Sequence, residues 1–75
     1  MINLKQIEKS SSISGIGYSE EKEVLKIRFK RKGIEYLYHK VPKKEYEDLS
    51  KAESIGKHFH EHIKGIYVAT RVHQS

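Results

Sequence analysis

The chain has 75 residues, of which fifteen are Lys or Arg and ten are Asp or Glu, for a formal net charge of +5, and it has no cysteine. This length makes one domain, close to the lower limit at which a single core holds a chain together without help. The composition excludes disulfides and cysteine-based zinc sites. No stretch has the pattern of a signal peptide or could span a membrane, so we expect a cytoplasmic protein without membrane contacts.

Positive charge is concentrated in the middle of the chain. Residues 22–44 contain nine basic and two acidic residues, a net charge of +7, which leaves −2 for the remainder. A local excess of positive charge attracts polyanions, chiefly nucleic acid or acidic protein surfaces. The alternative is a solvated strand face whose lysines prevent edge-to-edge aggregation.

The first part of the chain predicts a flexible segment followed by strands. Residues 1–9 hold irregularly spaced apolar side chains, and we expect a flexible segment before a single domain over residues 10–72. Small residues between apolar ones predict a short strand over residues 13–18.

The next strand, over about residues 23–31, has a clear period of two. Three apolar side chains alternate with three cations along it: Leu25, Lys26, Ile27, Arg28, Phe29 and Lys30. This alternation predicts a half-buried strand with a cationic outer face. A further strand is predicted from residue 34 to about residue 41.

The length of the turn between these two strands decides where two tyrosines point. We expect Lys32 and Gly33 to form the whole turn, because glycine tolerates positive φ. Tyr36 and Tyr38 then lie on the core face, with Tyr36 opposite Phe29 and Tyr38 opposite Ile27. One more loop residue would place both rings among the cations of the outer face, as a surface on which nucleobases can stack. The first register matches the apolar pattern better.

Two helices are expected in the second half of the chain. Pro42 suits the first turn of a helix over about residues 43–52, and Ser54 has the character of an N-cap for a second helix that ends at Gly65. The β-prone residues 66–72 add a strand or extend the helix. The predicted fold is α+β, a three-stranded antiparallel meander packed against two short C-terminal helices.

An ordered set of spaced residues resembles the KTSC domain family, named for the C-terminus of some lysyl-tRNA synthetases. The set comprises Ser10, Ser11, Ile13, Ile16, Gly17, Tyr18, Leu25, Ile27, Phe29, Gly33, Tyr36, Leu37, Tyr38, Val41, Pro42, Ala52, Ser54, Gly56, Phe59, Ile63, Tyr67 and Arg71. The resemblance covers about residues 10–71 and implies a small bacterial or phage protein with a role in RNA binding. Two positions depart from the family pattern: Ser19 stands where an acidic residue is common, and His60 where asparagine is usual.

The basic hairpin is the candidate nucleic-acid site. Alternate side chains on one strand face lie about 6.6–6.8 Å apart, near the spacing of successive phosphates on an extended single strand. The candidate residues are Lys26, Arg28, Lys30, Arg31, Lys32, Tyr36, Tyr38, Lys43 and Lys44. The cations would contact phosphates, and the tyrosines would stack on bases if they are exposed. For the tyrosines the alternative is a buried pair in the core.

Two other patterns are weaker candidates. His58, Glu61 and His62 formally match an inverted zinc-peptidase motif, but a catalytic zinc needs a third protein ligand and an enclosing cleft. Ser54 and Lys57 could hold an anion at a helix N-terminus, although helix capping and close packing explain the same residues. We therefore predict no metal, no cofactor and no catalytic residue.

The leading hypothesis is a small non-catalytic module that binds nucleic acid, with RNA or single strands favoured. The alternative is a protein-interaction module, a stand-alone bacterial or phage factor that docks on a host protein. That alternative would use Tyr67, Val68 and a strand edge for β-augmentation or for a small oligomer. The sequence leaves open the choice between RNA, DNA and protein, and also the oligomeric state.

Overall fold

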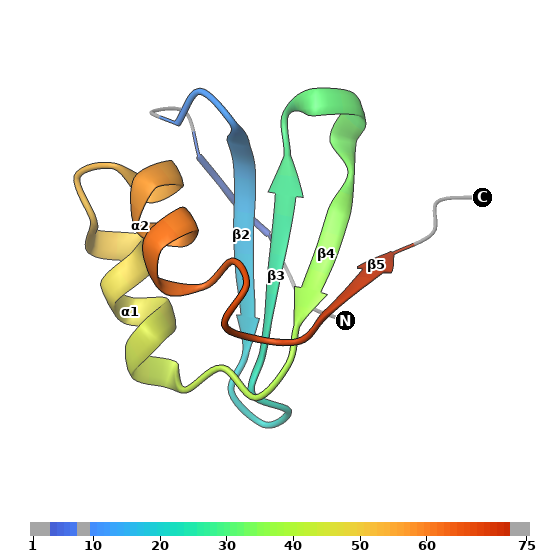
Figure 1. Cartoon of the computed structure of the whole chain (residues 1–75), viewed down its shortest axis with the longest axis vertical. Coiled ribbons are helices and arrows are strands. Elements are labelled where there is room, and N and C mark those ends of the chain that lie inside the picture. Colours follow the sequence, from blue (N-terminus) through green and yellow to red (C-terminus); the bar gives the residue numbers. More distant parts are fainter. Residues whose placement is uncertain (1–3, 8–9, 73–75) are drawn as a thin grey trace.

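The computed structural model describes residues 4–7 and 10–72, and within them it forms one antiparallel sheet with two helices (Figure 1). The elements are β1 (Lys5–Gln6), β2 (Ile13–Ser19), β3 (Val24–Phe29), β4 (Glu35–Tyr38), α1 (Lys43–Lys51), α2 (Ile55–His62) and β5 (Ala69–Val72). The sheet has five strands in the order β1-β2-β3-β4-β5. The α+β class is confirmed, whereas the predicted count of three strands is wrong.

The two additional strands lie at the edges of the sheet. Strand β1 pairs its Lys5 with Ile16 of β2 and is only two residues long, too short to show a strand period in the sequence. Strand β5 pairs with β4 after the chain has passed through both helices, so its pairing is non-local. The strand alternative for residues 66–72 is therefore the observed one. The flexible segment predicted over residues 1–9 falls partly on residues 1–3 and 8–9, outside the described residues.

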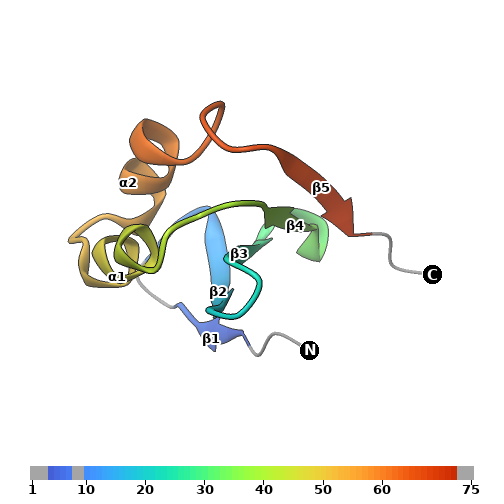
Figure 2. The same ribbon diagram turned by 90° about the horizontal axis from the view of Figure 1, so that it is seen from below.

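Both helices lie on one face of the curved sheet (Figure 2). Helix α1 begins directly after Pro42, and the Oγ of Ser54 caps α2 by accepting a hydrogen bond from the N–H of Lys57 at 3.3 Å. The core between helices and sheet contains Ile13, Ile16, Leu25, Ile27, Tyr38, Val41, Leu49, Phe59 and Ile63.

Neither helix is long and apolar enough to cross a membrane, and nor is any other helix in the part of the chain that the structure describes.

The pairing of β3 with β4 corrects the predicted register by two residues. Tyr36 lies opposite Ile27, and Tyr38 lies opposite Leu25. Because side chains alternate with a period of two, a shift of two residues leaves every side chain on its predicted face. Both tyrosines therefore lie on the core face, as the favoured register requires.

The loop between these strands is longer than the predicted two-residue turn. The N–H of Phe29 donates to the carbonyl of Ile34 at 2.8 Å, so residues 30–33 form the loop, which includes a 3₁₀ turn over Arg31–Gly33. Lys32 has φ 57° and Gly33 has φ 62°. A positive φ is unusual for lysine, and sequence reasoning assigned that conformation to the glycine.

The side chain of Tyr18 ties β2 to the start of α1. Its hydroxyl donates to the carbonyl of Val41 at 2.6 Å, and its ring stacks on Tyr46 with a centroid separation of 5.1 Å. Burial, and then the negative charges of Glu23 and Glu20, raise the pKa of Tyr18. The phenol therefore stays protonated and keeps its donor.

Candidate nucleic-acid interface

The outer face of the sheet, opposite the helices, carries a buried carboxylate between two of the predicted cations. Glu35 is 4% exposed. It accepts a hydrogen bond from Nε of Arg28 at 2.7 Å, and Nζ of Lys26 lies 3.2 Å from its other oxygen. Burial by itself raises the pKa of Glu35, but the hydrogen bonds and positive charges of Arg28 and Lys26 outweigh it and lower the pKa overall. Lys26 and Arg28 thus already have an ionised partner within the fold.

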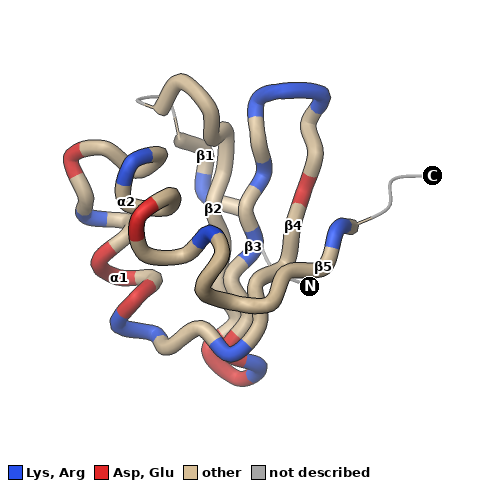
Figure 3. The backbone as a smooth tube through the Cα atoms, viewed as in Figure 1, with Lys and Arg blue, Asp and Glu red and all other residues tan. Residues whose placement is uncertain are grey.

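The loop at the end of the hairpin holds three cations of a different kind. We call Lys30, Arg31 and Lys32 the hairpin tip. All three side chains are exposed, and none forms an ion pair with any described residue. The tip projects at the end of the sheet as a continuous run of basic residues (Figure 3). Its charge is therefore open to an external anion.

The remaining candidate cations lie at the other end of the molecule. Lys43 and Lys44 begin α1, well away from the hairpin tip (Figure 3). Nζ of Lys43 lies 3.3 Å from Glu20 in an exposed ion pair. The structure therefore does not bring these two lysines together with the tip, and it divides the nine predicted residues into separate groups.

The two candidate tyrosines differ in exposure. Tyr38 is 6% exposed, packs edge-on against Phe59, and has its pKa raised to about 12 by burial and then by neighbouring Tyr36. A ring this buried cannot stack on an external base. Tyr36 is only partly buried and contacts Phe29 edge-on with a centroid separation of 5.8 Å. Of the two, Tyr36 alone is placed to meet a ligand.

Beside Tyr36 the structure has a pocket of about 370 Å³, which we call the aromatic pocket. Its lining residues are Ser11, Ser12, Phe29, Arg31, Ile34, Tyr36 and His60. Its surface is mainly apolar, and its lining includes Arg31 of the hairpin tip, two serines and a histidine. The volume falls within the range of small-molecule sites.

Arg71 adds a further cation next to Tyr36. It lies opposite Tyr36 in the pairing of β4 with β5, so its side chain leaves the sheet on the same face. Directly opposed residues of antiparallel strands have Cβ atoms about 4.5–5.5 Å apart. Arg71 is exposed and has no ion pair within the described part of the chain.

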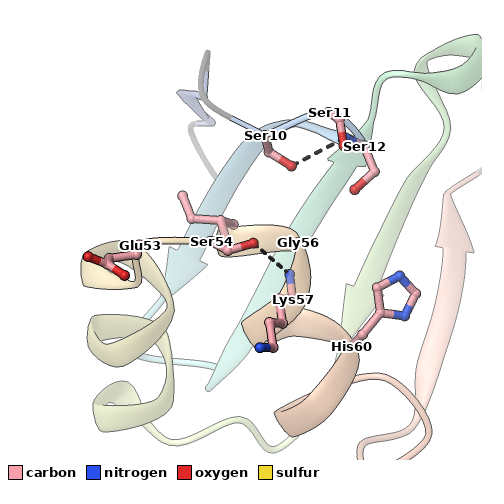
Figure 4. Close-up of a pocket in the computed structure, with 9 residues that line it drawn as sticks. Ser10, Ser11, Ser12, Glu53, Ser54, Gly56, Lys57 and His60 are labelled. Carbon is pink, nitrogen blue, oxygen red and sulfur yellow. Dashed lines mark hydrogen bonds between the residues drawn. The ribbon is translucent and has the colours of Figure 1, made fainter.

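A second pocket, of about 530 Å³, adjoins the first and shares Ser11, Ser12 and His60 with it. Figure 4 shows this serine pocket, which is lined by Ser10, Ser11, Ser12, Glu53, Ser54, Ile55, Gly56, Lys57 and His60. The segment Ser10–Ser12 and the first turn of α2 form its two sides.

Two features hold the sides of the serine pocket in place. The buried Oγ of Ser10 accepts hydrogen bonds from the N–H groups of Ser12 and Ile13, at 3.3 and 3.1 Å. Gly56 allows α2 to approach closely, because a Cβ there would lie 3.1 Å from Oγ of Ser12 and 3.4 Å from Oγ of Ser10. The glycine is thus explained by packing, as is Ser54 by its capping bond.

The candidate metal residues lie elsewhere on α2. Nε2 of His58 is 3.3 Å from Oε1 of Glu45 on α1, and the rings of His58 and His62 stack with a centroid separation of 4.4 Å. Among residues 4–7 and 10–72, no three His, Cys, Asp or Glu side chains are grouped so that they could hold a metal ion.

Sequence reasoning did not nominate the two pockets. Ser11, Ser12, Ile34 and His60 come from three separate segments, and no local pattern relates them. Parts of the lining had been nominated separately: Arg31 and Tyr36 through the basic hairpin, and Ser54 and Lys57 through the helix N-terminus. The resemblance added Ser10, Ser11 and Gly56. His60, which departs from that pattern, lines both pockets.

The described residues form a small α+β domain with an exposed basic loop beside two adjoining pockets. The family model described as the KTSC domain matches residues 9–67. The crystal structure of a KTSC domain protein from Yersinia pestis superposes with a TM-score of 0.91 at 29% sequence identity, over 97% of this chain and 100% of that one. This chain belongs to the KTSC domain family.

Two curated relatives are similar in sequence. An uncharacterised protein of Stutzerimonas stutzeri (strain A1501) is 36% identical over 56 residues, which span 75% of this chain and 78% of the relative. A protein of Tsukamurella paurometabola is 41% identical over 49 residues, spanning 65% of this chain and 72% of the relative. The names of these relatives state no activity.

Proposed function

We propose that this KTSC domain is a non-catalytic module that binds single-stranded nucleic acid, RNA in particular, with its hairpin tip. The observation that carries the proposal is the run of three exposed cations that form no ion pair with a described residue, next to a pocket whose wall includes a partly exposed tyrosine. Cations held beside an aromatic surface are the common arrangement for binding an extended single strand.

The charge of the tip supports phosphate contacts better than the outer face of the sheet does. Any phosphate that binds Lys26 or Arg28 competes with the buried carboxylate of Glu35, which already accepts hydrogen bonds from both. The cations of the tip have no such competitor in the described structure. The proposed contacts are therefore those of Lys30, Arg31 and Lys32, and the sequence-based set is narrowed to them.

A single strand suits this surface better than a duplex. Sequence-specific duplex readers place a helix or a two-stranded ribbon in the major groove. Here the exposed cations lie on a short loop, and the neighbouring aromatic group is recessed beside it. Unstacked bases of a single strand can reach such a position, whereas paired bases within a helix cannot.

The test is a fluorescence-anisotropy titration of the protein with single-stranded RNA, single-stranded DNA and duplex DNA at several salt concentrations. For single strands, the logarithm of the binding constant falls with the logarithm of salt by about 0.7 per phosphate contacted. Changing all three cations of the hairpin tip to glutamate should therefore reduce this slope by about 2 and weaken binding. Affinity that does not change with salt would refute the proposal.

A matched control makes the same change in net charge at the other end of the sheet. Lys22 precedes β3, Lys40 follows β4, and Lys44 lies in the first turn of α1; all three are exposed. The variant with these three lysines changed to glutamate should retain most of the affinity and nearly the whole salt slope. An equal loss in both variants would indicate non-specific attraction by net charge instead of a site at the tip.

A second candidate function is protein interaction at the β5 edge. Strand β5 is the last strand of the sheet, and just before it Ile66 and Val68 are 62% and 74% exposed. An exposed edge strand with apolar neighbours can accept a strand from a partner. Sedimentation equilibrium of the protein and of a Val68→Asp variant tests self-association there: concentration-dependent association that the variant abolishes would favour this function.

A further inference from the structure

The outer positions of β2, β3 and β4 offer no Phe or Tyr ring on which a base could stack. The register places Gly15 and Gly17 beside Arg28 and Lys26, and Leu37 beside Lys26 on the other side. None of these outer positions in β2, β3 or β4 carries Phe or Tyr. A strand that binds the hairpin tip therefore meets a Phe or Tyr ring on the core face, where the helices leave it uncovered.

The uncovered part of the core face is the aromatic pocket. Phe59 of α2 packs against Phe29 and Tyr38, with centroid separations of 5.5 and 5.4 Å, so the cover provided by α2 reaches these two rings. Tyr36 lies beyond them, and of the four rings it and Phe29 are partly exposed and line the pocket. Its edge-on contact with Phe29 holds its ring in position, which lowers the entropy cost of stacking a base on it.

Cations flank Tyr36 on two sides. Arg31 lines the pocket from the hairpin tip, and Arg71 stands opposite Tyr36 on β5. The phosphates on either side of an inserted base would each have a guanidinium within reach of the pocket. Arginine also stacks on aromatic bases, which lysine does not do as well.

The pocket lining also includes residues with hydrogen-bonding groups. These are Ser11, Ser12 and His60, all three exposed. A hydroxyl both donates and accepts, and a neutral imidazole has one donor and one acceptor nitrogen. A base has a flat apolar face and a polar edge, and the lining combines a mainly apolar, aromatic surface with two serines and a histidine.

We propose that the aromatic pocket takes one unstacked nucleobase of the bound strand, which stacks on Tyr36 with its polar edge toward His60 and the two serines. This inference rests on the proposed function and deepens it, because it divides affinity into two parts. The hairpin tip supplies a part that depends on phosphates, and the pocket supplies a part that depends on a base.

Oligonucleotides with and without bases separate these two parts. The probes are labelled single strands of about eight nucleotides, namely oligo(U), oligo(A) and an abasic strand, all titrated at one salt concentration. Stacking of one base on an aromatic side chain should make the base-containing strands bind about 5- to 150-fold more tightly than the abasic strand. Tyr36→Leu should remove this difference while leaving the affinity for the abasic strand unchanged.

The control for Tyr36→Leu is Tyr67→Leu. Tyr67 is also partly buried against the core, but it does not line the aromatic pocket. Its replacement should leave the difference between base-containing and abasic strands intact. Conversely, glutamates at the hairpin tip should weaken binding of both kinds of strand.

A third variant provides a direct signal and does not depend on the stability of Tyr36→Leu. The chain has no tryptophan, so Tyr36→Trp introduces a single indole that a stacked base should quench. Quenching by oligo(U) or oligo(A) but not by the abasic strand supports the pocket. Equal binding of abasic and base-containing strands to the wild-type protein, or a base-dependent difference that survives Tyr36→Leu, would overturn it.

The failure of this inference is distinguishable from failure of the proposed function. If salt-dependent binding occurs without any contribution from bases, the hairpin tip binds phosphates and the pocket has no role. If no strand binds at all, the proposed function and this inference both fall.

Discussion

Replacing Glu35 with glutamine should destabilise the domain by about 2 kcal/mol. The carboxylate is 4% exposed and accepts from both Arg28 and Lys26. Hydrogen bonds to charged groups contribute about 1.5–3 kcal/mol, and removing one partner of a fully buried ion pair costs about 3–5 kcal/mol. The side chains of Arg28 and Lys26 are 46% and 19% exposed, so both can regain water, which places the expected loss toward the lower end.

Urea denaturation and a thermal melt followed by circular dichroism measure this loss. For a domain of this size, about 2 kcal/mol corresponds to a fall in Tm of about 8–16 °C. Glu21→Gln is the matched control, because Glu21 is exposed in the β2–β3 loop and has no ion pair with a described residue. The control should change the free energy of unfolding by less than about 0.5 kcal/mol.

The stability difference between the wild type and Glu35→Gln should depend on pH, and the pKa shift of Glu35 gives the direction of this dependence. Burial raises the pKa of Glu35, but the hydrogen bonds and charges of Arg28 and Lys26 lower it further, so its pKa in the folded state lies below that in the unfolded chain. Such a group stabilises the fold above its unfolded pKa, and the contribution is lost as the pH falls toward the folded pKa. The difference between the wild type and Glu35→Gln should therefore shrink from about pH 5 downward. Equal stability at pH 7, or a difference that does not change on acidification, would refute the reasoning.

Three further substitutions test individual hydrogen bonds by urea denaturation. Ser54→Ala removes the N-cap of α2 and should cost about 1 kcal/mol, whereas Ser54→Asp should retain the cap; equal losses in both would contradict the capping role. Tyr18→Phe removes the donor to the carbonyl of Val41 but keeps the stacked ring, and should cost about 1 kcal/mol; no change would show that water replaces the bond. Ser10→Ala removes the acceptor of two backbone N–H groups and should cost about 1–3 kcal/mol, more than Ser11→Ala at its exposed neighbour.

The face of the sheet on which each side chain of the central hairpin lies was predictable, because it depends only on the alternation of apolar and charged residues. The apolar residues of β3 alternate with cations, and that pattern assigns each side chain to a face whatever the register is. The pairing itself depends on the loop, where Lys32 adopts a positive φ that lysine rarely takes. A loop two residues longer than expected moved every pair but left Tyr36 and Tyr38 on the core face.

The alternation could not predict which cations of the hairpin pair with a carboxylate and which do not. Glu35 interrupts a basic stretch, and its role depends on its lying opposite Arg28, which only the observed register provides. Likewise Arg71 lies beside Tyr36 because β5 returns to the sheet after both helices. Contacts between residues so far apart in sequence leave no periodic trace, whereas the N-cap at Ser54 is a local signal and was predicted.

The cations of this hairpin differ in whether they contact a carboxylate. Lys26 and Arg28 contact Glu35, whereas the cations of the hairpin tip have no ion pair with a described residue, so Glu35 affects both the stability of the fold and the charge available for binding. Lys26 and Arg28 give their hydrogen bonds to Glu35, so the Glu35→Gln variant that loses stability also releases both cations for phosphates. Affinity for an abasic strand and for oligo(U) should therefore rise by the same factor in this variant, because the proposed base contact is at Tyr36, on the opposite face of the sheet. A rise confined to oligo(U) would mean that the base-dependent part of binding reaches the outer face, which would contradict the assignment of the base to the pocket beside Tyr36.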